Sequence, residues 1–113
     1  MFASGSQLAQ TRPANTSTAT AYTAKKQTEV TRFVICNTTG TASTFSLYHD
    51  DDGSTYDQTT ALVYSASIAA NTTQFIDFFG TGSGIFVTAN GTIGIQSGTS
   101  SALTFSIYGV LAA

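Results

Sequence analysis

The residues whose side chains could take part in catalysis or bind a metal lie in one short polar stretch. His49 is the only histidine, and three aspartates follow it directly, with Ser54 close behind. These side-chain types make up a catalytic triad, but triad groups converge from separate elements, whereas these are neighbours along a turn. The G-x-S-x-G motif that exposes a nucleophilic serine is also missing from the sequence. We therefore expect a solvated histidine in a turn, and no enzymatic activity.

The same aspartates could bind calcium. Asp50, Asp52 and Ser54 alternate as the first three ligands of an EF-hand loop do, but the glycine and the final glutamate of that loop are missing. With Asp57 added, a looser calcium site is an alternative to an ordinary acidic turn. The glycine-rich residues 80–84 lack the lysine of a phosphate-binding loop and lead into a strand. No cofactor or metal is therefore expected.

Composition excludes several classes of function. Charged residues make up 9% of the chain, against about 25% in ordinary soluble domains, and 21 threonines and 13 serines replace them. Four cationic residues are too few for a basic patch, so nucleic acid is not an expected partner. A membrane-spanning helix needs about 18 consecutive apolar residues, and no run in the sequence is close to that length. No signal-peptide pattern is visible either. A weakly charged surface rich in hydroxyls favours a protein that functions within an assembly.

Strand-like segments account for the chain from about residue 18 onward. Roughly eight short runs rich in β-branched and aromatic residues are separated by turn residues. Residues 30–40 and 44–48 flank a small polar turn and are predicted to pair as a hairpin, and Asn90-Gly91 predicts a second hairpin between residues 85–89 and 92–96. In the closing run, Leu103, Phe105 and Ile107 alternate with polar residues. The predicted fold is all-β: a single antiparallel, jelly-roll-like β-sandwich over residues 18–113.

Two strands carry more apolar surface than one core can cover. Residues 33–36 are all apolar, so both faces of that strand are hydrophobic, and its single cysteine, Cys36, is interpreted as a small buried hydrophobe. In residues 75–79, Asp77 shares a face with Phe75 and Phe79, and burying a carboxylate is costly. We therefore expect these two rings to face outward, with Ile76 and Phe78 inside. A buried pair between Asp77 and Arg32 is the alternative.

Residues 1–17 are polar and have little apolar periodicity, which predicts a flexible N-terminal arm. Two interpretations are open: a disordered tail, or an arm that becomes ordered on a neighbouring subunit. In the second case Phe2 and Leu8 are its hydrophobic anchors.

Three segments resemble small β-rich structural proteins of tailed bacteriophages. They are residues 31–47, which read TRFVICNTTGTASTFSL, residues 67–73, SIAANTT, and the closing residues 103–110, LTFSIYGV. The order of these motifs also matches, and the resemblance covers about residues 20–110. It departs at residues 24–27, Ala-Lys-Lys-Gln, where such proteins tend to carry a Val-Pro-Ala-Gly-like turn.

The resemblance implies a virion protein assembled in the bacterial host cytoplasm. The first hypothesis is a capsid decoration, or cement, protein on the capsid exterior, a homotrimer whose partner is the major capsid protein. Its candidate contact residues are Phe2, Leu8, Phe33, Phe75 and Phe79. The alternative is a tail, neck or head-fibre component in which Tyr48, Tyr56 and Tyr64 contact host glycans. A free carbohydrate-binding module is a third possibility.

Overall fold

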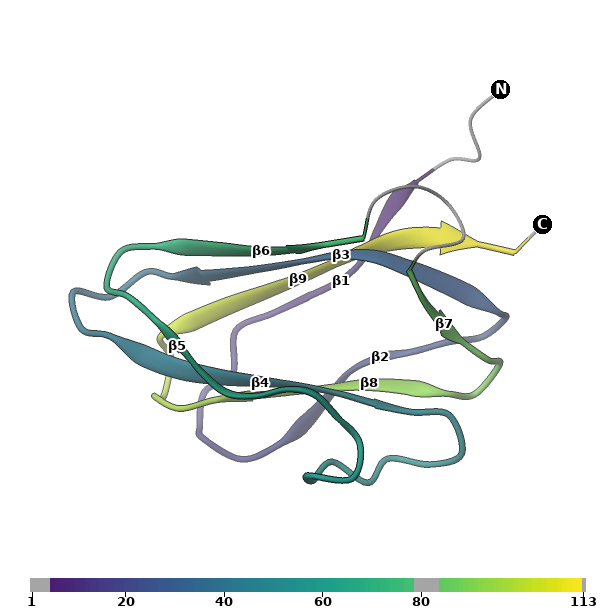
Figure 1. Cartoon of the computed structure of the whole chain (residues 1–113), viewed down its shortest axis with the longest axis horizontal. Helices are drawn as coiled ribbons and strands as arrows, with labels where there is room; N and C mark the ends of the chain where they lie inside the picture. The colour runs from purple at the N-terminus through teal and green to yellow at the C-terminus, as the bar shows by residue number, and fades with distance from the viewer. Residues whose placement is uncertain (1–4, 79–83, 113) are drawn as a thin grey trace.

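The chain folds into two antiparallel β-sheets packed face to face (Figure 1). The computed structural model describes residues 5–78 and 84–112, which contain nine strands and no helix, and therefore no helix that could span a membrane. Sheet A has the order β1 (Ser6–Thr11), β9 (Leu103–Leu111), β3 (Thr28–Asn37) and β6 (Thr73–Asp77), and β7 (Ile85–Val87) also pairs with β3. Sheet B has the order β2 (Ala19–Thr23), β8 (Thr92–Ser97), β4 (Ser43–Asp50) and β5 (Ala61–Ile68). This is the strand order of a jelly roll, so the predicted all-β sandwich is confirmed.

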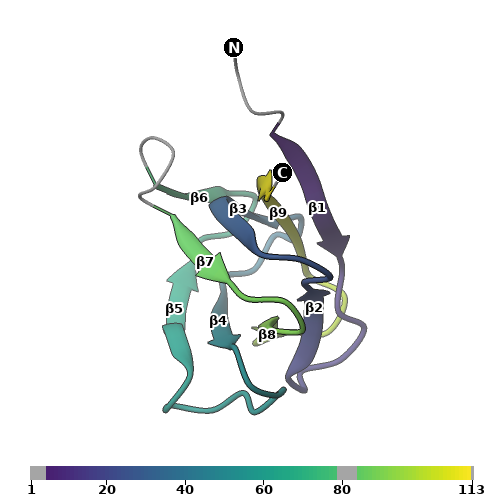
Figure 2. The ribbon, with the colours of Figure 1, turned by 90° about the vertical axis from the view of Figure 1, so that its right-hand side faces the viewer.

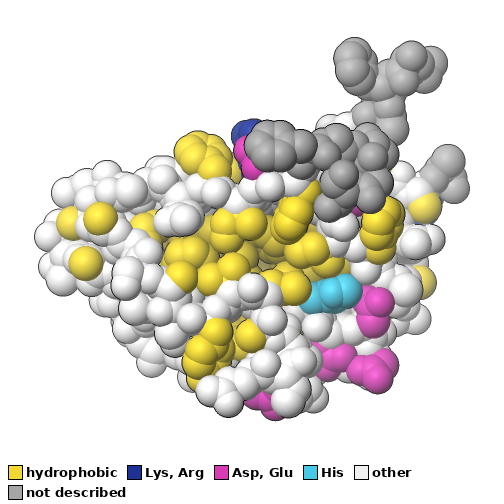
Figure 3. All heavy atoms as spheres, viewed as in Figure 1, with side chains coloured by type: hydrophobic (Ala, Val, Ile, Leu, Met, Phe, Trp, Pro, Cys, Tyr) yellow, Lys and Arg dark blue, Asp and Glu magenta, His cyan; other side chains and the backbone are white. Residues whose placement is uncertain are grey.

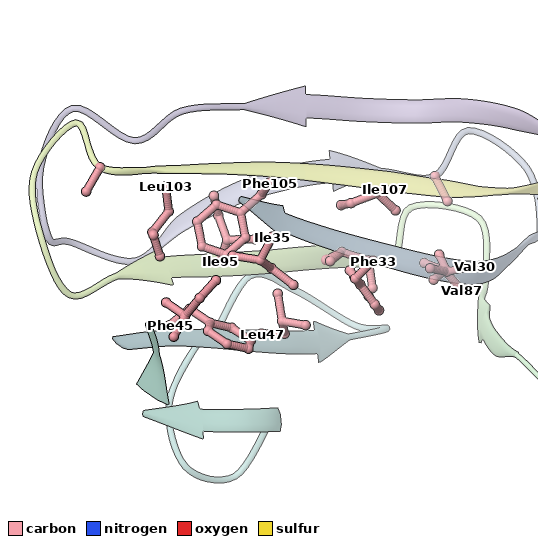
Figure 4. Close-up of a cluster of buried hydrophobic side chains, with 14 residues drawn as sticks. Val30, Phe33, Ile35, Phe45, Leu47, Val87, Ile95, Leu103, Phe105 and Ile107 are labelled. Carbon is pink, nitrogen blue, oxygen red and sulfur yellow. The ribbon is translucent and has the colours of Figure 1, made fainter. Parts of the chain in front are cut away.

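The core lies between β3 and β9 on one side and β4 and β8 on the other. Phe33, Ile35 and Phe105 of sheet A face the side chains of sheet B across this layer (Figure 4). Alternate residues of each strand point inward, and the predicted inward face of β9 is confirmed. Burying one such side chain contributes about 1.5–3 kcal/mol, so this layer is the main source of stability.

The central pair of strands does not form the predicted hairpin. β3 belongs to sheet A and β4 to sheet B, and residues 38–42 carry the chain from one sheet to the other. Asn37, which is buried, holds this crossing: its Nδ2 donates to the carbonyl oxygens of Thr41 at 2.9 Å and Ala69 at 3.1 Å. The inward faces of both strands are strongly apolar, and they meet across the core instead of lying side by side.

The second predicted hairpin is also wrong, and the turn itself lies one residue earlier than predicted, with Ala89 and Asn90 at its centre. Asn90 has the expected positive φ of 71°, and Gly91 N donates to the carbonyl oxygen of Thr88 at 2.8 Å. However, β7 pairs with β3, whereas β8 pairs with β2 and β4. The turn of residues 88–91 therefore connects the two sheets.

The N-terminal segment differs from the expected flexible arm over residues 6–11. These residues form β1, which pairs with β9 at the edge of sheet A (Figure 2). Leu8 and Ala9 pack against the core, and Arg12 donates to Thr38 Oγ1 at 2.8 Å and to the carbonyl oxygen of Ser101. The pairing of an edge strand depends on backbone hydrogen bonds. The polar side chains of this segment therefore gave no sign that it forms a strand.

Hydrophobic side chains are visible along one side of the sandwich. Figure 3 shows a band of them between the two sheets, on the side where β5 and β6 form the edges. Val63 and Ala66 of β5, together with Ile76 and Phe78, are half-buried and pack against the core from this side. The expected inward placement of Ile76 and Phe78 is thus confirmed.

Candidate functional site

The outer face of sheet A carries an ion pair stacked on an exposed aromatic ring. Arg32 Nε donates to Asp77 Oδ1 at 2.6 Å, and Nη2 donates to Oδ2 at 2.9 Å. The guanidinium carbon lies 5.5 Å from the centroid of the Phe75 ring, and Phe75 is 57% exposed. The hydrogen bond to Asp77, followed by its negative charge, raises the pKa of Arg32. The pairing anticipated as an alternative exists, but at the surface rather than in the core.

The register between β3 and β6 explains this arrangement. Arg32 lies opposite Asp77, and Val34 lies opposite Phe75, so all four side chains point to the outer face. Tyr108 of β9 completes a shallow depression of about 730 Å³ between these strands and β1. Cys36, expected to be buried, is half-buried.

A second exposed phenylalanine lies further along the same face. Phe86 of β7 is opposite Glu29 of β3, and it is 47% exposed. Its neighbour Val87 is buried in the core, so Phe86 points away from it. Residues 85–87 are all apolar, so the sequence carried no signal that Phe86 points outward. We call the surface formed by Arg32, Val34, Phe75, Asp77, Phe86 and Tyr108 the contact face.

The candidate contact residues lie in different environments. Phe75 faces outward as predicted, whereas Phe33 is 2% exposed and belongs to the core, so its assignment to a subunit contact is wrong. Leu8 packs against the core of its own domain and is not a free anchor. Phe2 and Phe79 lie outside the described residues.

The acidic residues at the end of β4 form hydrogen bonds within the loop that follows. The two carboxylate oxygens of Asp50 accept backbone N–H groups of Asp52 at 3.2 Å and Thr55 at 2.8 Å. His49 Nε2 lies 2.7 Å from Asp51 Oδ1, at the surface. Contact with the Asp52 side chain, followed by the Thr55 N–H, lowers the pKa of Asp50, and the same carboxyl contact raises the pKa of Asp52. Within residues 5–78 and 84–112, no group of three or more potential ligands is arranged to hold a metal ion.

The outer face of sheet B carries a groove lined by tyrosines. The Tyr48 and Tyr56 rings have centroids 5.8 Å apart, and Tyr48 Oη donates to Gln96 Oε1 at 2.9 Å. Tyr64 is 53% exposed, whereas Tyr48 is 1% exposed. Of the three tyrosines suggested by the sequence, Tyr48 is therefore a buried support rather than an exposed contact. The groove has a volume of about 520 Å³, and we call it the tyrosine groove; its lining consists of Thr18, Tyr48, Tyr56, Asp57, Gln58, Thr59, Tyr64 and Gln96.

The structure is a jelly-roll sandwich in which one outer face carries an exposed phenylalanine beside an ion pair and the other carries a groove lined by tyrosines. Comparisons with protein-family models, with curated proteins and with solved structures found no match to this chain. Function is therefore inferred from the geometry of the two faces.

Proposed function

We propose that this protein is a capsid decoration protein of a tailed bacteriophage. It binds the outer surface of the head and stabilises it. The observation that carries the proposal is the contact face, where Phe75 is exposed beside the paired side chains of Arg32 and Asp77. Aromatic and arginine side chains are enriched at the energetic centres of protein interfaces.

The contact face is preorganised for binding another protein. Two hydrogen bonds to Asp77 fix the guanidinium of Arg32, so little side-chain entropy remains to be lost when a partner covers it. Val34 and Phe75 supply the apolar area around this pair. A partner that covers Phe75 removes its exposed ring from water, which favours association.

The low charge of the protein suits the binding of many copies to one capsid. With 9% charged residues and a net charge of −2, the chain has little electrostatic repulsion between copies, which suits close packing of many molecules. A homotrimer presents three contact faces to neighbouring subunits of the major capsid protein, and several weak contacts made together hold far more tightly than one. Jelly-roll sandwiches also recur among viral capsid proteins, which supports the proposal by analogy of fold.

The test combines oligomeric state with capsid binding. We expect the purified protein to sediment as a trimer and to pellet with empty capsids of its phage, and Phe75→Asp to lose pelleting. Leu62→Asp is the matched control, because Leu62 is 41% exposed on β5 of the opposite sheet. A wild-type monomer indifferent to capsids, or a Phe75→Asp variant that pellets as wild type, would overturn the proposal.

The contribution of the N-terminus needs a shorter truncation than residues 1–17. Removing all seventeen residues would delete β1 and uncover the edge of β9. Removal of residues 1–4 leaves β1 in place and tests whether Phe2 anchors the protein to the shell. We expect this truncation to weaken pelleting without changing the free energy of unfolding.

A further inference from the structure

We infer that the tyrosine groove on the outer face of sheet B is a binding site for a neutral oligosaccharide. This surface belongs to the sheet opposite the contact face, and the inference does not depend on the capsid role. It rests on the groove and its exposed tyrosine, on a backbone irregularity at this position, and on the hydrogen-bonding groups around it.

The volume of the groove is in the range of small-molecule sites. Its main part, of about 520 Å³, adjoins a second hollow of about 260 Å³, and both are lined by Tyr64 and Gln96. Volumes of about 300–1,000 Å³ are typical of small-molecule sites in proteins. Tyr64 and Gln96 therefore lie where the two hollows meet.

A β-bulge in β5 includes Tyr64. In the ladder between β4 and β5, Leu47 pairs with Val63 and Phe45 pairs with Ala66, so two residues of β5, Tyr64 and Ser65, lie opposite the single residue Ser46. Such bulges redirect side chains and are common next to functional sites.

The backbone at this bulge adopts a costly conformation. Ser65 has a φ of 51°, which is uncommon for a residue with a side chain. Its N–H donates to Ser46 Oγ at 2.9 Å, and Ser46 is buried, so the conformation is held from beneath. Conformations of this kind cluster at ligand-binding positions. Tyr64, which precedes Ser65, is 53% exposed at the groove.

Polar groups around the ring are held in place by their own partners. Gln96 Oε1 accepts from Tyr48 Oη at 2.9 Å, and its Nε2 donates to the carbonyl oxygen of Thr16 at 3.0 Å. An amide can donate two hydrogen bonds and accept two, so Gln96 keeps capacity for a ligand. Asp57 Oδ1 accepts the Thr59 N–H at 2.8 Å, and the hydrogen bonds from Thr59 lower the pKa of Asp57.

These groups match the chemistry of a sugar. The C–H face of a pyranose packs on the electron-rich face of an aromatic ring, while its hydroxyl groups need both donors and acceptors around it. Tyr64 supplies the ring, and Gln96 and Asp57 supply the hydrogen bonds. Asp57 is the only charged residue among the described residues that line either hollow. An acidic sugar would be repelled, so the ligand is neutral.

The experiment screens the intact protein on an array of immobilised neutral and acidic glycans. The best neutral glycan is then titrated into ¹⁵N-labelled protein in solution. We expect shifts in the Gln96 side-chain amide and in the Thr59 and Tyr64 amides. Tyr64→Ala should weaken binding at least about tenfold, which corresponds to about 1.4 kcal/mol, whereas Tyr64→Phe retains the ring and should bind nearly as wild type.

Leu62→Ala is the matched control, since Leu62 is also exposed on β5 but does not line the groove. Binding to no neutral glycan, preference for acidic glycans, shifts confined to other surfaces, or equal weakening by Leu62→Ala and Tyr64→Ala would each overturn the inference. Phe75→Asp should leave glycan affinity unchanged, which separates this result from the outcome of the capsid experiment.

Discussion

The ring of Tyr56 lies directly on the backbone of Gly94. A methyl group at Gly94 would lie 2.5 Å from Cδ1 of that ring, so only glycine allows this contact. The Tyr56 hydroxyl is 2.6 Å from Thr20 Oγ1, which ties the same side chain to β2. Through these two contacts the loop of residues 51–60 is held against sheet B, where Tyr56 covers Tyr48 and forms one wall of the tyrosine groove.

Replacing this glycine should release the loop. We expect Gly94→Ala to displace the Tyr56 ring and to lower the free energy of unfolding by about 1–3 kcal/mol, the usual cost of overpacking. Urea unfolding followed by tyrosine fluorescence measures this, because the chain has five tyrosines and no tryptophan. Gly40→Ala is the control, since a Cβ there meets nothing within 4 Å. Equal unfolding midpoints for the two variants would contradict the prediction.

Alanine substitution of Phe33 and of Phe75 should change the free energy of unfolding by very different amounts. Phe33→Ala removes a ring that is 2% exposed, and we expect a loss of about 3–5 kcal/mol in the free energy of unfolding. Phe75→Ala removes a ring that is 57% exposed and should change stability by no more than about 0.5 kcal/mol. Chemical denaturation of both variants decides the matter. Comparable losses would show that Phe75 is part of the core.

Asn37 should stabilise the crossing between the sheets. Asn37→Ala leaves the carbonyl oxygens of Thr41 and Ala69 without their side-chain donor, and we expect a loss of about 1–3 kcal/mol in the free energy of unfolding. Thermal unfolding measures the effect. Asn15→Ala serves for comparison, because the Asn15 side chain bonds only locally to Ser17 N among the described residues, in an exposed turn. A similar shift in melting temperature for both variants would refute the assigned role of Asn37.

The contact between Asp50 and Asp52 should make stability depend on pH in two opposite ways. The pKa of Asp50 is lowered in the folded protein, so Asp50 stabilises the fold at pH values above the ordinary value of 3.8, and this contribution is lost as the pH falls through the lowered pKa. The pKa of Asp52 is raised, so Asp52 favours the fold at low pH, and that contribution is lost as the pH rises through the raised pKa.

The two aspartates should therefore respond oppositely to neutralisation. At pH 7 we expect Asp50→Asn to lower the urea midpoint and Asp52→Asn to raise it, and both differences should shrink below about pH 4, near the ordinary pKa of aspartate. Urea unfolding at neutral and acidic pH tests the sign of each effect. Changes of the same sign at pH 7 would rule out the proposed opposition.

Some features of the structure were readable from local sequence patterns. The alternation of Leu103, Phe105 and Ile107 predicted the inward face of β9, and the cost of burying Asp77 predicted that Phe75 points outward. The positive φ of Asn90 likewise followed from its residue type. Each of these properties depends on a residue and its immediate neighbours, so a single strand or turn is enough to specify it.

The candidate surfaces were only partly predictable. Tyr64 was singled out from its residue type, but the bulge beside it forms opposite Ser46 of another strand and has no local sequence signal. Tyr48 was expected to be exposed, and it is buried because a loop later in the chain folds over it. Phe86 escaped notice because a three-residue strand offers too little alternation to reveal its direction.

The sequence by itself determined that the chain forms short amphipathic strands that stack into two layers, because alternation with a period of two is a local property of each strand. Only the tertiary structure decided which strands pair. β3 and β4 are neighbours in the chain but lie in opposite sheets, and β1 joins β9 from the far end of the sequence. Pairing is decided by backbone hydrogen bonds, which every strand offers alike, and by the burial of apolar faces across the whole molecule. No local pattern encodes that competition.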